Sequence, residues 1–289
     1  MNPEYPIYVI SKGRAESRLT IKALEKMNVP FKVAIEPQEF EAYNKYIEYS
    51  KLLVLPFSNL GQGSIPVRNF CWEHSIKNGF KRHWILDDNI LEFTRFNHNL
   101  KIRVDSGTIF RIAEIFTDRY KNIGFSGFNY RTFAMQRDGF RINPYYLNTR
   151  VYSCTLINNE LPFRWRGLYN EDTDICLRML KEGWCTVLFN AFLANKLATL
   201  TMKGGNTEEV YGDSDNRLKF AESLKNQHPE HVEIVWRYNR WHHEVNYDFK
   251  QKLIRVDGYD NNVNKGINEF GMKIINLNTF EKSKERGQI

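Results

Sequence analysis

The first 90 residues alternate short apolar runs with amphipathic segments, and this alternation limits the possible folds most. Apolar runs stand at 7–10, 31–35, 52–55 and 84–86, each too brief for a helix and suited to a buried strand. The segments between them carry apolar side chains at helical spacing. Strands that alternate with helices pair in parallel and are covered by helices. The sequence therefore predicts an α/β fold with a mainly parallel sheet flanked by helices.

The fourth apolar run ends at Asp87, Asp88 and Asn89. In open α/β sheets, ligands bind beyond the carboxyl ends of the strands, where this triplet is expected to lie. Carboxylate and amide oxygens at such a place suit Mg²⁺ or Mn²⁺. Asp and Asn are also ordinary in turns and helix N-caps. The triplet alone therefore leaves both a metal site and a structural turn open.

A second acidic cluster, formed by Glu171, Asp172 and Asp174, opens a predicted helix. The helix macrodipole stabilises carboxylates at this end, which gives at least one of them a structural explanation. Three acids exceed what capping requires, and an ionised carboxylate at the mouth of a cleft can act as a general base toward a hydroxyl. Catalytic use is favoured if this cluster meets Asp87 and Asp88.

Basic residues follow the predicted strands and offer partners for phosphate. Lys12 and Arg14 follow the first strand, Arg68 follows a glycine-containing loop after the third, and Lys203 lies in a Lys-Gly-Gly-Asn loop. Arginine binds phosphate through bidentate contacts, and a flexible loop can close a lysine over a substrate. Taken singly, each residue is equally compatible with a solvated side chain or a plain turn.

Two adjacent histidines, His242 and His243, stand beside a tryptophan near the end of the regular part of the chain. Neutral imidazole is a common metal ligand. Adjacent residues on a strand face opposite ways, so at most one of the two is expected to bind a metal. A purely structural role is the alternative.

Loops rich in arginine and aromatic residues occupy the middle of the chain and include Arg131, Trp165 and Arg166. Such side chains stack on nucleobases and contact phosphates in proteins that bind single-stranded nucleic acid. Ordinary surface packing is the competing interpretation.

Composition narrows the class of protein. The chain has 289 residues, of which 42% are apolar, so it can bury a core; 41 Lys and Arg against 34 Asp and Glu give a net charge of +7, compatible with a polyanionic partner. Four scattered cysteines without a CxxC pair indicate a reducing compartment and no zinc site. No signal-peptide pattern and no window near the roughly 18 apolar residues of a membrane span is present. We expect a cytoplasmic protein without a membrane partner.

Five stretches of the sequence, taken in their order, resemble the TET-associated glycosyltransferases, a GT-A-type family found largely in bacteriophages. They are PIYVISKGR, GQGSIPVRN, ILDDN, NEDTDICLRMLKEGW and KGGN. The resemblance implies a GT-A-like, Rossmann-type mixed sheet in a single domain over residues 1–250. Its nucleotide-binding half would span 1–100 and its acceptor half 101–250, followed by a C-terminal extension over 251–289.

The family is thought to transfer sugars onto hydroxymethylated pyrimidines such as hydroxymethylcytosine in DNA, so the resemblance implies a DNA partner and a nucleotide-sugar donor, expected to be a UDP-sugar. The catalytic base would be Asp172, with Glu171 beside it. The other implied roles fall into three sets: Lys12, Arg14, Arg68, Asp87 and Lys203 for the nucleotide; Asp88, Asn89 and His242 or His243 for Mn²⁺ or Mg²⁺; and Arg131, Trp165, Arg166 and Asp174 for the acceptor. One departure is Asn89, at the third position of the metal triplet, where many GT-A enzymes have aspartate.

A base on the face opposite the leaving diphosphate would give inversion at the anomeric carbon, by the geometry known from glycoside hydrolysis. A double-stranded acceptor would have to rotate its base out of the stack to reach the site. Two alternatives stay open: the same donor chemistry on a protein or glycan hydroxyl, and a non-catalytic DNA-binding module with a degenerate sugar site.

Overall fold

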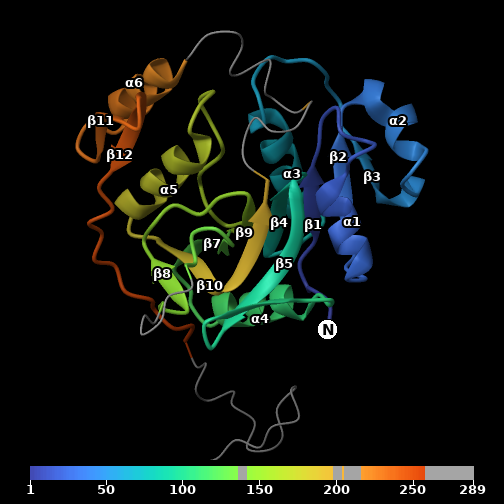
Figure 1. Ribbon diagram of the computed structural model, residues 1–289, viewed down its shortest axis with the longest axis horizontal. Coiled ribbons are helices and arrows are strands. Elements are labelled where there is room, and N and C mark those ends of the chain that lie inside the picture. Colours follow the sequence, from blue (N-terminus) through green and yellow to red (C-terminus); the bar gives the residue numbers. More distant parts are fainter. Residues whose placement is uncertain (136–141, 198–203, 205–215, 258–289) are drawn as a thin grey trace, which may run out of the picture. The chain divides into compact units, whose positions relative to one another are not determined.

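A mixed sheet lies at the centre of the protein (Figure 1). The computed structural model describes residues 1–135, 142–197, 204 and 216–257, and residues up to Ile254 form one compact unit. Within the described residues, ten strands join this sheet in the order β3-β2-β1-β4-β9-β7-β10-β5-β6, with β8 paired to β10.

The elements fall into an alternating first half and a strand-rich second half. The first half contains β1 (Ile7–Ile10), α1 (Leu19–Lys26), β2 (Lys32–Ile35), η1 (Pro37–Glu39), α2 (Phe40–Asn44), η2 (Tyr49–Lys51), β3 (Leu52–Val54), α3 (Ile65–Lys77) and β4 (Arg82–Asp87). The second half contains β5 (Ile90–Asn97), β6 (Leu100–Arg103), α4 (Thr108–Asp118), β7 (Ile123–Tyr130), β8 (Tyr145–Leu147), β9 (Cys154–Asn158), α5 (Glu171–Lys181), β10 (Cys185–Lys196), α6 (Arg217–Gln227), β11 (Val232–Arg237) and β12 (Arg240–Val245).

The predicted α/β fold is confirmed, and its first half is the parallel part of the sheet. Strand β1 pairs in parallel with β2 and β4, and β2 pairs in parallel with β3. The register sets Ile10 opposite Asp87, so β1 and β4 end together. Because β2 and β3 lie on one side of β1 and β4 on the other, the strand order reverses here, which is where open sheets bind ligands.

The second half adds antiparallel strands that make the sheet mixed. Strand β9 pairs antiparallel with both β4 and β7, while β10 runs parallel to β7 and antiparallel to β5. The β5–β6 hairpin was not anticipated. Its two-residue turn uses His98 and Asn99, both with positive φ, in place of the Asn-Gly pair that marks such turns in a sequence.

Two apolar layers cover the two faces of the sheet. Alternate strand residues such as Val9 and Trp84 pack with α1 and α4 on one face, and their neighbours Tyr8 and Ile85 pack with α3 and α5 on the other. This period of two is what a strand buried on both faces requires. The four cysteines are buried and unpaired, which agrees with the expectation of free thiols.

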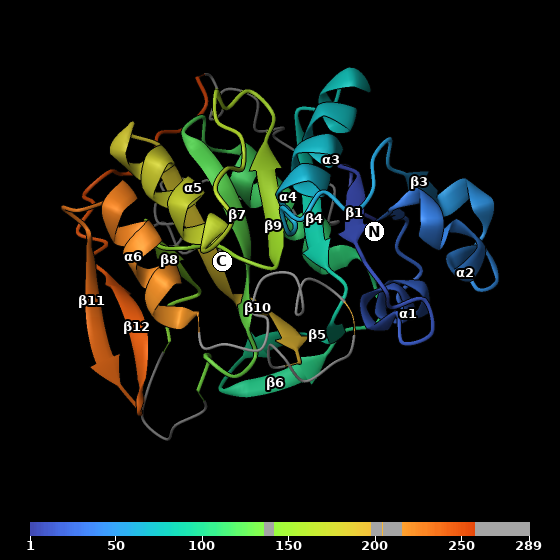
Figure 2. The same ribbon diagram turned by 90° about the horizontal axis from the view of Figure 1, so that it is seen from above.

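A smaller apolar cluster joins α6 and the β11–β12 hairpin to α5. It is formed by Leu177, Leu224 and Val232, with Val245 packed against it. Figure 2 shows the hairpin beside α6. Among the described residues, no helix is both long and apolar enough to span a bilayer.

Candidate active site

Asp87 is the centre of a polar cluster at the carboxyl end of β4. Its Oδ1 accepts a hydrogen bond from Arg68 Nη2 at 3.1 Å, and its Oδ2 accepts from Ser153 Oγ at 2.7 Å and Lys196 Nζ at 2.8 Å. Burial would raise the pKa of Asp87, but the two cations outweigh it and hold the pKa below its ordinary value. Asp87 is therefore a fixed negative charge.

Lys196 is a candidate site residue that the sequence reasoning missed. It is the last residue of β10, after a register shift at Asn195, and its ammonium also donates to Ser153 Oγ at 2.9 Å and Tyr130 OH at 3.3 Å. Its side chain is 14% exposed. Although burial opposes it, the charge of Asp87 raises the pKa of Lys196. The signal for it in the sequence is a lysine that closes the largely apolar stretch of β10.

Asp88 contacts a different group of residues, next to the loop after β1. Its carboxylate accepts from Ser11 Oγ at 2.7 Å and forms an ion pair with Arg14. Burial nonetheless raises the pKa of Asp88, because it outweighs the opposing effect of Arg14. The structure thus brings together Asp88 and Arg14, two residues predicted for the donor side.

Gly204, which follows β10 in sequence, lies at this same place. Arg14 Nη2 donates to the carbonyl of Gly204 at 3.0 Å, and a Cβ on Gly204 would come within 2.6 Å of the carbonyl oxygen of Gly13. Gly204 has φ of +77°, a conformation that favours glycine. The neighbouring Lys203 lies outside the described residues. The predicted nucleotide ligand Lys12 pairs with Glu36 at 3.4 Å.

The second acidic cluster stands at the first turn of α5. Glu171 Oε1 accepts from Ser64 Oγ at 3.1 Å and lies 3.9 Å from Arg68 Nε. Asp172 Oδ1 is buried and accepts no hydrogen bond from the described residues. Burial, assisted by the carboxylates of Glu171 and Asp87, raises the pKa of Asp172 to about 7 in spite of the nearby guanidinium of Arg68.

Arg68 joins the two acidic clusters, which are far apart in sequence. It is 3% exposed, contacts Asp87 directly, lies beside Glu171, and its charge acts on Asp172. Its guanidinium carbon stands 4.8 Å from the centre of the Trp165 ring, a cation–π contact that fixes it further. The carboxyl end of β4 and the start of α5 therefore face one polar site.

Arg150 forms another part of this site, beyond Asp172. Its Nη1 lies 3.5 Å from Thr173 Oγ1, and its guanidinium stands 4.7 Å from the Tyr152 ring centre. Its charge lowers the pKa of Asp172 in part. Burial first, then Arg150, lowers the pKa of His243 to about 4. The structure therefore places His243 on the Arg150 side of the site and keeps it neutral near pH 7.

The residues predicted for the acceptor are mostly engaged inside the protein. Asp174 accepts from Arg166 Nη2, Arg178 Nε and His228 Nε2, each at 2.9 Å, and is 1% exposed. Trp165 is buried beneath the Arg68 guanidinium. These contacts fasten α5 to its preceding loop and to α6. Another predicted acceptor residue, Arg131, donates its backbone N–H to Ala194.

The residues predicted to bind a metal do not come together as a set of ligands in the described part of the chain. In the described part of the chain, no three His, Cys, Asp or Glu side chains gather as ligands, and His242 and His243 occupy opposite faces of their strand. The carboxylates of Asp87 and Asp88 already accept from cationic or hydroxyl donors. The buried Oδ1 of Asn89 accepts no bond from the described residues, but one amide oxygen is too few for a site. This donor set does not fit a divalent ion.

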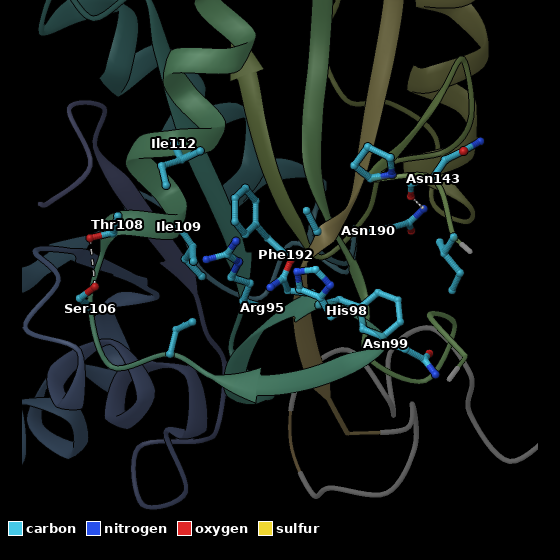
Figure 3. A pocket seen from close by; sticks show the side chains of 16 residues that line it. Arg95, His98, Asn99, Ser106, Thr108, Ile109, Ile112, Asn143, Asn190 and Phe192 are labelled. Atoms are coloured by element: carbon cyan, nitrogen blue, oxygen red, sulfur yellow. Dashed lines mark hydrogen bonds between the residues drawn. The ribbon is translucent and has the colours of Figure 1, made fainter. Parts of the chain in front are cut away.

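A separate cavity of about 860 Å³ lies at the far end of β5 (Figure 3). It is bounded by the β5–β6 turn, the start of α4 and the segment before β8. Asn190 of β10 reaches into its wall and donates to the carbonyl of Asn143 at 2.9 Å. None of the predicted site residues lines it, so the cavity is distinct from the cluster around Asp87.

Comparison with known proteins identifies the class. The model of the TET-associated glycosyltransferase family matches residues 5–205. The protein with this fold and site is thus a glycosyltransferase. More particularly, the chain belongs to the TET-associated glycosyltransferase family, which confirms the resemblance seen in its motifs. Among curated proteins, none matches the sequence.

Solved structures offer only a distant likeness. One is a protein from Desulfovibrio desulfuricans G20 named as a nucleotide-diphospho-sugar transferase. It is 10% identical, with a TM-score of 0.40 over 78% of this chain and 98% of the other.

Proposed function

We propose that this glycosyltransferase moves a sugar from a nucleotide sugar, with UDP as the expected nucleotide, onto the hydroxyl of a hydroxymethylated pyrimidine in DNA, with inversion. One observation carries the proposal: Arg68 joins Asp87 to the start of α5. There, Asp172 has a buried oxygen that accepts no hydrogen bond from the residues that the structure describes, and its pKa is raised to about 7. A carboxylate with that pKa is suited to accept a proton near neutral pH.

The reaction proposed is a single displacement. The acceptor oxygen attacks the anomeric carbon while the bond from that carbon to the diphosphate oxygen breaks, and Asp172 takes the hydroxyl proton. Attack from the side opposite the leaving group inverts the configuration. The proton ends on Asp172, and the electron pair of the broken bond ends on the diphosphate.

The protein's own cations would stabilise the departing diphosphate. Arg14, Arg68 and Lys196 surround Asp87 and Asp88, and three positive charges face two negative ones. Cations held in place in a partly buried site stabilise the negative charge that develops on the leaving group. Guanidinium groups also bind phosphate oxygens through paired hydrogen bonds.

The expected Mn²⁺ or Mg²⁺ is not supported by this arrangement. An ion bound to Asp87 would have to displace the ammonium of Lys196, which already contacts three oxygen atoms. We therefore assign the stabilisation of the diphosphate to the three side-chain cations and route no step through a metal.

DNA as the acceptor rests on the family name and on the net charge of +7, which suits a polyanion. A protein or glycan hydroxyl would use the same donor chemistry. A non-catalytic DNA-binding module is the second alternative, but DNA binding alone does not require a buried carboxylate with a raised pKa near the guanidinium groups of Arg68 and Arg150.

The test is transfer itself. The protein is incubated with a panel of sugar nucleotides and with DNA that does or does not contain hydroxymethylated pyrimidines, and the released nucleosides are analysed by mass spectrometry. Glycosylated hydroxymethylpyrimidine from the modified DNA alone is the expected result. Transfer to protein but never to modified DNA would refute DNA as the acceptor. If no sugar nucleotide is consumed with any acceptor, the proposed reaction is refuted.

A further inference from the structure

The β11–β12 hairpin carries an apolar face that runs from the protein interior into solvent. The pairs Val232–Val245, Ile234–His243 and Trp236–Trp241 alternate along the ladder and so share one side of it. At its base, Val232 is fully buried against α5 and α6, whereas Trp236 is 55% exposed and Trp241 is 37% exposed. This face therefore continues beyond the core that it helps to build.

The tip of the hairpin displays a third aromatic side chain at a conformational cost. Tyr238 and Asn239 form the two-residue turn, with φ of +53° and +58°. Such turns favour Asn and Gly, because a side chain is strained there. Tyr238 is 88% exposed, so burial does not offset that strain. Its ring is therefore open to a ligand.

The opposite side of the tip carries two arginines. Arg237 faces Arg240 across the ladder. Arg237 pairs with Glu244 at 3.0 Å, and Arg240 donates to His242 at 3.0 Å. The Arg237 side chain is 58% exposed. An aromatic side and an arginine side on one projecting ribbon are the combination that binds bases and phosphates of a nucleic-acid strand.

The aromatic side also leads to the candidate active site. His243 lies between the tryptophan pair and the base of the hairpin, and it is close enough to Arg150 to be influenced by its charge. Arg150 in turn contacts Thr173, the residue after Asp172. The base of the same face packs on Leu177 of α5, the helix that begins with the acidic cluster. A DNA strand lying on the tip would thus stand beside Asp172, the proposed catalytic base.

We propose that the hairpin tip, defined as Trp236 to Trp241, is a stacking platform for the nucleobases of the acceptor DNA strand beside the target base. This inference rests on the proposed function, because it names the part of the protein that holds the same acceptor. The rings of Trp236 and Trp241 lie 5.0 Å apart at 71°, so one braces the other while its outer surface stays open to a base. The arginines on the other side contact phosphates.

The test compares DNA binding by the wild type, the double variant Trp236→Ala/Trp241→Ala and Tyr238→Ala, with no donor present. A fluorescent oligonucleotide containing hydroxymethylcytosine is titrated with each protein. Each tryptophan that is replaced by alanine can no longer stack on a nucleobase. The dissociation constant of the double variant for DNA is therefore expected to rise about tenfold or more. The matched control is Tyr49→Ala, a 72% exposed tyrosine on η2, which should leave the constant unchanged.

Three outcomes would overturn the platform. The first is unchanged DNA binding by the double variant, while the wild type binds and glycosylates the same DNA. The second is an equal loss of DNA binding by the control Tyr49→Ala, which would show that the loss is not specific to the tip. The third is a change in oligomeric state by light scattering without a change in DNA affinity, which would assign the tip to a protein contact. If the wild type itself never modifies DNA, the proposed function has failed instead.

Discussion

The ammonium nitrogen of Lys196 lies 2.8 Å from Oδ2 of Asp87, at the ends of two strands that β9 and β7 separate in the sheet. This pair ties the predicted ligand-binding edge of the parallel half to the mixed half. It also supplies a cation where the sequence had suggested a metal. The role of Lys196 in the reaction can therefore be tested separately from that of the acids.

Lys196→Met is expected to lower kcat about 100-fold or more, because one pre-positioned charge on a developing anion contributes on that scale. Asp87 keeps Arg68 and Ser153 as partners in this variant, so the fold should persist. Steady-state kinetics with saturating donor measure the effect. Lys181→Met, at the exposed end of α5, is the matched control, and an equal loss there would contradict a local role.

Removal of divalent ions is expected to leave transfer within about threefold of its initial rate, because three side-chain cations already face the two aspartates. The measurement is the initial rate after treatment with EDTA and exchange into metal-free buffer. Loss of activity that Mn²⁺ or Mg²⁺ restores would contradict the assignment of diphosphate stabilisation to the three side-chain cations alone.

The pH dependence of kcat/KM should show one acidic limb near pH 7. Burial and the neighbouring carboxylates raise the pKa of Asp172 to about 7, and only the ionised form accepts a proton. Activity therefore falls as pH drops below this value, by about tenfold per unit. In Glu171→Gln, one of the groups that raise this pKa is absent, so the limb should move to lower pH. An acidic limb at the same pH in Glu171→Gln and the wild type would show that the limb does not report the ionisation of Asp172.

Asp174→Asn is expected to destabilise the protein by about 3 kcal/mol, because it leaves buried His228 and two arginines without their common carboxylate. Burial alone would raise the pKa of Asp174, but His228 and the arginines lower it. Its contribution to stability is therefore present above the unfolded-state pKa and disappears as pH falls through the lower folded-state value. Urea denaturation at neutral and acidic pH measures both effects.

The control for that experiment is Glu73→Gln, which removes the exposed partner of Arg164. A surface ion pair of this kind contributes about 0–1 kcal/mol. Equal destabilisation by the two substitutions would contradict a structural role for Asp174. The predicted role of Asp174 in binding the acceptor would then be favoured.

The parallel half of the fold was predictable because its four strands alternate with helical segments whose apolar residues recur at helical spacing. Residue spacing placed Asp87 at a strand end and Asp172 at a helix start, and both features are present. The spacing could not reveal that β10 would run on to Lys196, because Asn190 interrupts its apolar pattern and is buried through hydrogen bonds to Asn129 and Asn143. The side chains around a site depend on such distant pairings.

The acceptor side shows the same limit. Arg166 was singled out in an aromatic and basic loop and Asp174 in the acidic cluster, and both were assigned to the acceptor through the family resemblance, but the structure pairs them with each other. Composition reports that a segment is rich in arginine, not which arginines have a buried carboxylate as partner. Conversely, Arg150 and the hairpin tip carry no motif. Arg150 belongs to the site because it contacts Thr173 of α5. The hairpin lies beside α5 because α6 and β11 pack against that helix.

The most direct measurement of the central claim compares wild type and Asp172→Asn under single-turnover conditions, with the same sugar nucleotide and hydroxymethylated DNA. Asparagine keeps the shape and cannot take the proton, so transfer by the variant should be slower by about 100- to 10,000-fold, while UDP binding by calorimetry persists. Transfer by Asp172→Asn within about threefold of the wild-type rate would contradict the assignment of Asp172 as the base.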